Sequence, residues 1–405
     1  MLALFADLKV TISPHIHWIA WLVLILPLIV SSIYKRGIVV SPSLWIGVFM
    51  FSIGIISSFF YNANLETLIQ LIKFLLIFIT LYFFLFYSVI NWGLIVSVIN
   101  IAVIINVLLL ILGLLGISAV SSLMTIDGRW GTIFVYPGSL VKIGIIGFYI
   151  NIFALLLYKT KEKFVPLVMV LLSVFIIYMD GSRTGMIAML VTLPIIPLLY
   201  SISNYRDKVK FILFPFILFI SFFTLILISL PFLKDFRIGK NILSLIQTPS
   251  ISSGLELIDP IRYSMYQVAI EKVISSPFLG SGAFSTIGTL EDTGGMVVHN
   301  TYLQAWGDFG ILGLIGMCSI CFGWIVLIPY LLKRIQINYD IKENVLICSS
   351  ILMLIYFVLN GLFHPYSTEF SEWIMYIIPL TICYTYLKND SQKVKEKICR
   401  NVVEM

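Results

Sequence analysis

Long apolar runs joined by mostly short polar connections make up most of the chain. An apolar run of about 20 residues crosses a bilayer as a helix, because the helix satisfies its own backbone N–H and C=O groups where lipid offers no partner. Eleven such runs are present: 15–34, 38–60, 68–90, 92–117, 140–158, 164–180, 184–202, 210–233, 303–332, 345–364 and 370–387. The pattern predicts an all-α, polytopic membrane protein with about 11 (11–12) transmembrane helices, forming a single integral membrane domain over residues 1–405.

Composition agrees with this interpretation and excludes a soluble domain. Of the 405 residues, 60% are hydrophobic and 11% are charged, with 30 Phe and 20 Tyr, far from the values typical of soluble globular domains. No internal repeat or low-complexity run is evident. The one long stretch without a predicted span is 234–298, and we expect function to be concentrated there.

Lysine and arginine collect on alternate connections, which predicts the orientation of the chain because cytoplasmic loops retain positive charge. Sixteen of the 26 basic residues lie on one predicted side, in the connections near 35, 160, 208, 333 and 342 and in the C-terminal tail. We assign that side to the cytoplasm. The opposite side then carries 118–139, 180–183, 234–298 and 361–369. The net charge of +6 reflects topology, and no nucleic-acid partner is predicted.

The long outer loop contains a predicted amphipathic helix. Asp259 is a suitable N-cap, Pro260 fits the first helical position, and apolar residues recur from Ile261 at i+4, i+7, i+8 and i+12. This stripe can lie on the membrane surface or on the helix bundle. Either arrangement leaves Arg262 in the first turn beside free backbone N–H groups, a favourable place for an anion.

Three arginines and one histidine on the predicted outer side suggest an anionic substrate and a proton acceptor: Arg129, Arg183, Arg262 and His299. An arginine inside the bilayer costs about 2.5–3.5 kcal/mol, less if it reaches the interface. One explanation of Arg183 is an interfacial pair with Asp180. The functional explanation is a guanidinium fork that binds phosphate through two hydrogen bonds.

His299 has two interpretations. It can be a boundary histidine satisfied by backbone or lipid headgroups, or a neutral imidazole that accepts a proton from a sugar hydroxyl as the hydroxyl attacks. Asp308, nine residues later, can orient or polarise that site. Lys73 and His364 are weaker candidates for lining a substrate cavity, and Tyr263 is among the outer aromatic residues that can stack on a sugar.

No metal site is predicted. His15-x-His17 stands beside Trp18 without an acidic residue, which is typical of a membrane interface. Cys318-x-x-Cys321 lies on an apolar span without a nearby His or acid, which favours core packing.

With these residues located, the chain resembles the O-antigen polymerase and O-antigen ligase superfamily of bacterial envelope glycosyltransferases. The resemblance rests on ordered motifs over about residues 128–316: Gly128-Arg129-Trp-Gly-Thr with a later Pro137, Ser182-Arg183-Thr-Gly185, Arg262-Tyr263-Ser-Met-Tyr-Gln-Val-Ala, Ser276-Pro277-Phe-Leu-Gly280-Ser-Gly282, and His299-Asn300-Thr-Tyr-Leu303 with Gly307-Asp308-Phe-Gly310. The chain departs from the family pattern in having Tyr136-Pro137-Gly138 for Asn-Pro-Asn and Asp308 where Glu is frequent.

The resemblance implies an inverting, metal-independent glycosyltransferase without a cofactor, located in the bacterial cytoplasmic (inner) membrane with its active site on the periplasmic face. Donor and acceptor would be undecaprenyl-pyrophosphate-linked oligosaccharides. Arg262 and Arg183 would hold the pyrophosphate and His299 would be the base, with Arg129, Asn300, Tyr263 and Asp308 contacting substrate.

Three functions fit these residues. The preferred one is polymerisation of lipid-linked repeat units into O-antigen or capsular polysaccharide, with a polysaccharide co-polymerase as a possible partner that regulates chain length. The second is an O-antigen ligase that transfers the glycan to lipid A core. The third, from another class, is a transporter of lipid-linked oligosaccharides, although such a protein should carry polar residues deep in many spans.

Overall fold

The computed structural model describes Val23 and residues 42–61, 65–86, 92–117, 129–203, 260–287, 296–337, 340–366 and 372–387. Helices form the regular structure of these segments, and the described β-structure is limited to two isolated bridges, Thr132 to Val135 and Ile287 to Val297. The predicted all-α class is therefore confirmed for the described part of the chain.

Five described helices are long and apolar enough to cross a membrane: Gly93–Leu114, Leu140–Leu157, Thr184–Ser203, Thr301–Ile337 and Ile341–Gly361. Three shorter apolar helices, Trp45–Tyr61, Thr67–Leu81 and Phe164–Asp180, coincide with further predicted spans. Residues 372–387 are also helical. The predicted spans at 15–34, apart from Val23, and at 210–233 lie outside the described residues, so the count of eleven stays a prediction, as does the full extent of the 234–298 loop.

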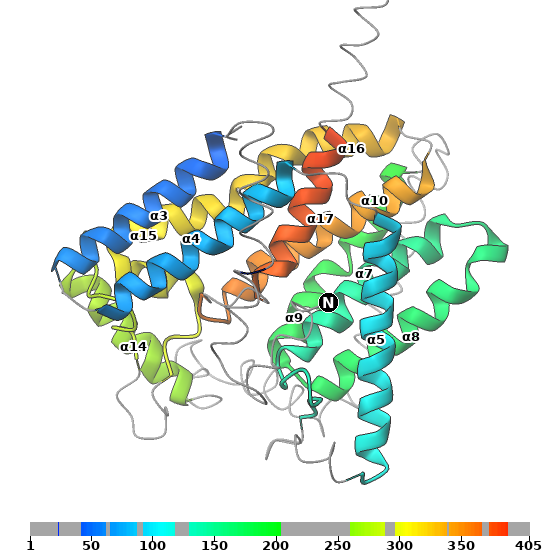
Figure 1. Cartoon of the computed structure of the whole chain (residues 1–405), viewed down its shortest axis with the longest axis horizontal. Helices are drawn as coiled ribbons and strands as arrows, with labels where there is room; N and C mark the ends of the chain where they lie inside the picture. Colours follow the sequence, from blue (N-terminus) through cyan, green and yellow to red (C-terminus); the bar gives the residue numbers. More distant parts are fainter. Residues whose placement is uncertain are drawn as a thin grey trace, which may run out of the picture.

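One half of the bundle is built on α3 (Pro42–Tyr61) and α15 (Thr301–Phe322), which run side by side with α4 (Leu65–Phe86) next to α3 (Figure 1). Glycines allow the close approach of α3 and α15. A Cβ on Gly54 would lie 2.7 Å from the backbone nitrogen of Gly313, and one on Gly316 would lie 2.3 Å from that of Phe51. Small residues at such a contact let two backbones pack directly in a membrane protein.

The other half surrounds α7 (Leu140–Leu157), most of which is buried. Helix α8 (Phe164–Asp180) packs along α7, and α5 (Trp92–Leu114) contacts both (Figure 1). The chain continues through α9 (Arg183–Thr192) and α10 (Ile195–Ser203). Helix α17 (Ile341–Gly361) contacts α7, α9, α10 and α15, and it thereby joins the two halves.

The two ends of the bundle differ in chemistry. At one end, Arg334 of α16 (Ile328–Ile337) pairs with Glu343 of α17 at 2.7 Å, and Tyr158 after α7 interacts electrostatically with Asp340. The basic residues of the predicted cytoplasmic connections 159–163 and 333–342 belong to this end. The polar motifs singled out in the sequence lie at the other end, where α15 begins and α17 ends.

A glycine kink in α15 shapes that second end. Gly310 has φ +67° and ψ −166°, a conformation that only glycine adopts readily, and a Cβ there would lie 2.1 Å from the carbonyl oxygen of Phe278. The kink frees helical carbonyl groups, and the 276–282 loop satisfies them: the N–H of Ser281 donates to the Gly307 oxygen at 2.9 Å. The 276–282 loop is thus locked into α15.

Helix α14 (Pro260–Ser275) confirms the predicted helix, while its predicted N-cap, Asp259, lies outside the described residues. It begins at Pro260, and Met265, Val268, Ala269 and Val273 on its apolar stripe are buried. Met265 and Ala269 form a small core with Val298. Of the two arrangements expected for the apolar stripe, the structure shows packing on the helix bundle, beside the segment that carries His299.

Candidate functional site

The first two turns of α14 bring Arg262 to the segment before α15. The hydroxyl of Tyr266, one turn after Arg262, donates to the carbonyl oxygen of His299 at 3.2 Å and approaches that of Leu362 at 3.5 Å. Arg262 is half-buried, as is Tyr263 beside it. Arg262 and His299 therefore lie at the same end of the bundle, although they are 37 positions apart in the sequence.

His299 has a defined orientation. Its Nδ1 lies 3.1 Å from the carbonyl oxygen of Val297. A carbonyl only accepts hydrogen bonds, so this contact favours the tautomer with the proton on Nδ1 and the lone pair on Nε2. A general base needs such a lone pair. The imidazole of His364 lies nearby, with its ring centre 6.3 Å from that of His299.

Asn300 is the N-cap of α15. Its Oδ1 accepts from the backbone N–H groups of Tyr302 and Leu303 at 3.0 and 2.9 Å, and its Nδ2 donates to the Leu362 carbonyl at 3.3 Å. Capping of this kind stabilises a helix by about 1 kcal/mol. The observed contacts of Asn300 thus fix the start of α15 next to the end of α17, and contact with substrate remains a prediction.

His364 follows the end of α17. The hydroxyl of Thr301 donates to its carbonyl oxygen at 2.9 Å, which ties the residue to the start of α15. The pKa of the imidazole is lowered from 6.5 to about 3, mainly by burial and also by the positive charge of Lys142, against the opposing effect of Glu372. His299 and Arg262 also act on it electrostatically. His364 is therefore an uncharged imidazole within a cluster of charged groups.

Lys142 and Glu372 form an ion pair that joins the first turn of α7 to the start of the 372–387 helix. Their side chains are 10% and 27% exposed. Neither residue was among the site residues predicted from the sequence. The available signal was a lysine inside the predicted span 140–158 and an acid inside the predicted span 370–387, both near their outer ends, because ionisable residues within spans are usually paired or functional.

Arg183 is the first residue of α9, which supports its predicted place at the start of a span. Ser182 caps the helix by accepting from the N–H of Gly185 at 3.2 Å. Gly185 packs on α7, since a Cβ there would lie 2.5 Å from the side chain of Val141, the neighbour of Lys142. The side chain of Arg183 lies outside the described part of the structure, so its role stays a prediction.

The described partners of Asp180 are Arg129, Gly138 and Val141, whereas the sequence suggested a pair with Arg183. It accepts from Arg129, whose Nε donates to the Asp180 carbonyl at 3.1 Å and whose Nη2 lies 3.4 Å from its Oδ1. The other carboxylate oxygen accepts from the N–H groups of Gly138 and Val141 at 2.7 and 2.9 Å. Arg129 thus helps to fix the start of α7. Its predicted contact with substrate is a separate and open prediction.

Asp308 is fully buried, which makes it an anchor within the protein. Its carboxylate accepts from the N–H of Phe284 at 3.1 Å, the hydroxyl of Ser285 at 2.9 Å, the hydroxyl of Tyr366 at 3.2 Å and, more weakly, Gln304 at 3.4 Å. Through Tyr366, it is linked to the segment that follows His364. That Asp308 orients the His299 site or contacts substrate stays a prediction.

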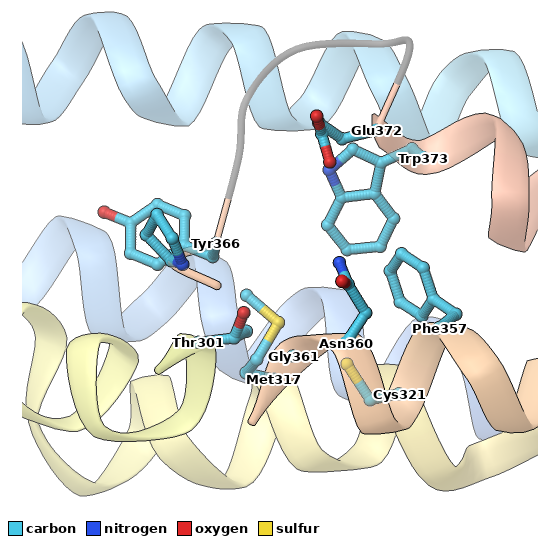
Figure 2. A pocket seen from close by; sticks show the side chains of 10 residues that line it. Thr301, Met317, Cys321, Phe357, Asn360, Gly361, Tyr366, Glu372 and Trp373 are labelled. Atoms are coloured by element: carbon cyan, nitrogen blue, oxygen red, sulfur yellow. The ribbon is translucent and has the colours of Figure 1, made fainter. Parts of the chain in front are cut away.

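A cavity lies between α15 and α17 next to these groups (Figure 2). Thr301, Met317 and Cys321 of α15 line one side, and Phe357 and Asn360 of α17 line another. Tyr366, Glu372 and Trp373 complete much of the wall. Of these residues, Glu372 is also paired with Lys142. The hydroxyl of Tyr366 donates to the buried carboxylate of Asp308.

The arrangement combines three chemical capacities at one end of the bundle. Arg262 supplies a delocalised cation in the first turn of α14, at the positive end of the helix dipole, which favours an anion. His299 offers an oriented basic nitrogen. The cavity provides partly apolar walls beside them. Stabilisation of a departing anion, proton acceptance and substrate positioning are the requirements of group transfer from a phosphorylated donor.

Comparison with known proteins agrees with this chemistry. Residues 167–318 match the family model described as O-antigen ligase. The match includes α9 with Arg183, α14 with Arg262, and His299 with most of α15 after it. A search of curated proteins found no match. The resemblance predicted from the ordered motifs is therefore confirmed for residues 167–318, which are similar to this family of O-antigen enzymes.

Proposed function

We propose that this protein is an inverting glycosyltransferase that polymerises undecaprenyl-pyrophosphate-linked oligosaccharide repeat units into O-antigen or capsular polysaccharide on the outer side of the bacterial cytoplasmic membrane. The observation that carries the proposal is the proximity of the Arg262 turn, the oriented imidazole of His299 and the cavity at one end of the bundle. The family match over these segments supports it.

The two arginines bind the pyrophosphate leaving group. As the glycosidic C1–O bond of the donor breaks, negative charge develops on the departing pyrophosphate. Arg262 and Arg183 hold this group through paired N–H donors, and a cation placed in advance in a low dielectric stabilises the developing charge strongly. The reaction needs no metal ion for this step, since the guanidinium groups supply the positive charge.

His299 deprotonates the acceptor hydroxyl. Its Nε2 takes the proton of the acceptor hydroxyl while the hydroxyl oxygen forms the new bond to C1 and the pyrophosphate leaves with the electron pair of the old bond. Attack from the face opposite the leaving group inverts the anomeric carbon. A single displacement also leaves no sugar attached to the enzyme, so a covalent glycosyl intermediate or a retained configuration would contradict this mechanism.

The second candidate is an O-antigen ligase, the function after which the matching family model is described. It uses the same donor and the same roles for Arg262 and His299, and it differs in the acceptor, lipid A core in place of a second lipid-linked repeat. Polymerases of this superfamily are numerous and diverse and need no core acceptor, so we prefer the polymerase. A chain-length regulator is a proposed partner of the polymerase alone.

A reconstituted reaction distinguishes the candidates. Purified protein is incubated with lipid-linked repeat units from a strain that lacks this chain, with and without lipid A core, and products are resolved by gel and mass spectrometry. A ladder of multiple repeats in the absence of core supports the polymerase. Transfer only to core supports the ligase, and no new glycosidic bond with either acceptor supports a transporter of the same lipid.

A further inference from the structure

Helix α14 carries a second set of apolar residues, which the predicted stripe did not include. Ile270 and Ile274 lie one turn apart and are exposed, Ile274 to 73%, whereas the buried stripe of the same helix faces the bundle. Phe278 and Leu279, in the turn that follows the helix, are also exposed, Phe278 to 72%. We call these four residues the outer apolar row. Single exposed apolar residues are ordinary, but four along one helix and its turn indicate a contact surface.

A polar row lies directly beside the outer apolar row. Gln267, Glu271 and Ser275 are exposed and follow one another at four-residue spacing. At 3.6 residues per turn, this polar row lies about 60° around the helix from Ile270 and Ile274. The exposed surface of α14 is therefore divided into an apolar flank and a polar flank. Such a division is typical of a helix that lies at the boundary between lipid and water.

The turn that carries Phe278 and Leu279 is fixed to α15. The indole N–H of Trp306 donates to the carbonyl oxygen of Pro277 at 3.1 Å. The carbonyl group of Phe278 packs against Gly310 at the kink, where a Cβ would lie 2.1 Å from its oxygen. The position of Gly310 along α15 therefore sets the depth of the outer apolar row in the membrane.

The depth of Gly310 follows from the length of the span that contains it. Thr301–Ile337 has 37 residues, whereas a hydrocarbon core of about 30 Å requires about 20. Lys333 marks the predicted cytoplasmic limit, and about 20 residues counted back from it reach Leu314. Gly310 lies four residues further out, which is about 6 Å at 1.5 Å per residue. The Phe278 turn is thus level with the headgroups of the outer leaflet.

Helix α3 indicates the same level independently. It runs antiparallel to α15, and the hydroxyl of Ser58 donates to the carbonyl oxygen of Asp308 at 2.7 Å. Phe60 and Tyr61 end α3 just beyond this contact and are 80% and 62% exposed. Exposed aromatic residues are enriched where membrane meets water. Figure 1 shows α14 at this end of α3, so both elements reach the same layer.

We propose that the outer apolar row inserts into the outer leaflet at the boundary between headgroups and acyl chains, with phospholipid as its occupant and the polar row in water. An interfacial helix buries its apolar side by about 5–10 Å, which fits the depth of Gly310. Exposed apolar residues of α15 continue below this level at Ile315 and Phe322. The row therefore extends the lipid-facing surface of the spans, which favours lipid over a protein partner. Insertion also holds Arg262, in the first turn of α14, near the lipid phosphates.

Site-specific photocrosslinking tests this placement. Full-length protein with p-benzoylphenylalanine at Ile274 or Phe278 is irradiated in nanodiscs of phosphatidylethanolamine and phosphatidylglycerol, and adducts are identified by intact mass. The matched controls carry the same amino acid at Gln267 or Ser275 in the polar row, and thermal unfolding verifies the fold of all four proteins. Ile274 and Phe278 should give at least about 10-fold more phospholipid adduct than the controls, because acyl chains reach the apolar flank alone.

The other outcomes overturn the proposal. A crosslink to a second copy of the chain would make the row a protein interface, and equal lipid adducts from both rows, or none from either, would remove the contrast between the flanks. An adduct that forms only after a polyprenyl pyrophosphate is added would assign the row to the tail of that lipid.

The crosslinking requires no turnover, so its result is independent of the proposed reaction. If the outer apolar row forms phospholipid adducts but the protein makes no glycosidic bond with any acceptor, the transferase function is wrong and the insertion stands. If the protein transfers glycans while the row forms no phospholipid adduct, the insertion is wrong and the transferase stands.

Discussion

Replacing His299 with asparagine separates a chemical role from a structural one. The imidazole Nδ1 lies 3.1 Å from the Val297 carbonyl, and the side-chain nitrogen of asparagine occupies a similar position, so this contact can persist. The bond from Tyr266 goes to the backbone oxygen of His299 and is independent of the side chain. The variant should therefore fold, with a loss of stability below about 1 kcal/mol, while it lacks a basic nitrogen.

The expected loss of activity is large. General base catalysis contributes about 10²- to 10⁴-fold, which corresponds to about 3–5 kcal/mol of transition-state stabilisation. Both His299→Asn and His299→Ala should therefore lose at least about 100-fold in repeat-unit transfer, measured as initial rates on purified protein, with thermal unfolding in detergent as the control for folding. A His299→Asn variant with more than a third of wild-type activity would show that the residue acts by holding the loop.

The pH dependence adds a second criterion for this variant. Protonation of the base should reduce the wild-type rate toward low pH, and this decline should be absent from the residual rate of His299→Asn. His364 cannot cause such a decline in the rate, because its pKa of about 3 leaves its imidazole uncharged throughout an assay range of about pH 5–9. An unchanged acid decline in the variant would mean that another group titrates.

Other residues give independent predictions. Arg262→Lys should lose nearly as much transfer activity as Arg262→Ala, because a point charge cannot reproduce the two-pronged contact with pyrophosphate; full activity of the lysine variant in the same assay would contradict this role. Asp308→Asn introduces an N–H₂ group among hydrogen-bond donors and should destabilise the fold by about 2 kcal/mol or more, seen as a lower unfolding temperature. Gly310→Ala meets both a positive φ and the Phe278 oxygen, so it should reduce folded yield on size-exclusion chromatography, whereas Gly323→Ala, with open space around its Cβ position, should not.

The sequence was sufficient where a local pattern has one physical solution. Apolar runs predicted the spans that the structure describes, and Pro260 with its apolar stripe predicted α14 and its buried face.

Pairings across the bundle were beyond sequence patterns. Asp180 binds Arg129, 51 positions away, because the start of α7 is brought next to the end of α8. Lys142 and Glu372 are 230 positions apart. Long-range contacts of this kind depend on how helices pack, and no local periodicity encodes them.

Localisation of the bound lipid diphosphate tests the central claim most directly. A structure of the protein with an undecaprenyl pyrophosphate donor analogue should place the diphosphate between Arg262 and Arg183, with the anomeric carbon on the side of His299. Diphosphate bound at the opposite end, beside the basic residues of 159–163 and 333–342, would contradict the proposed site and the mechanism built on it.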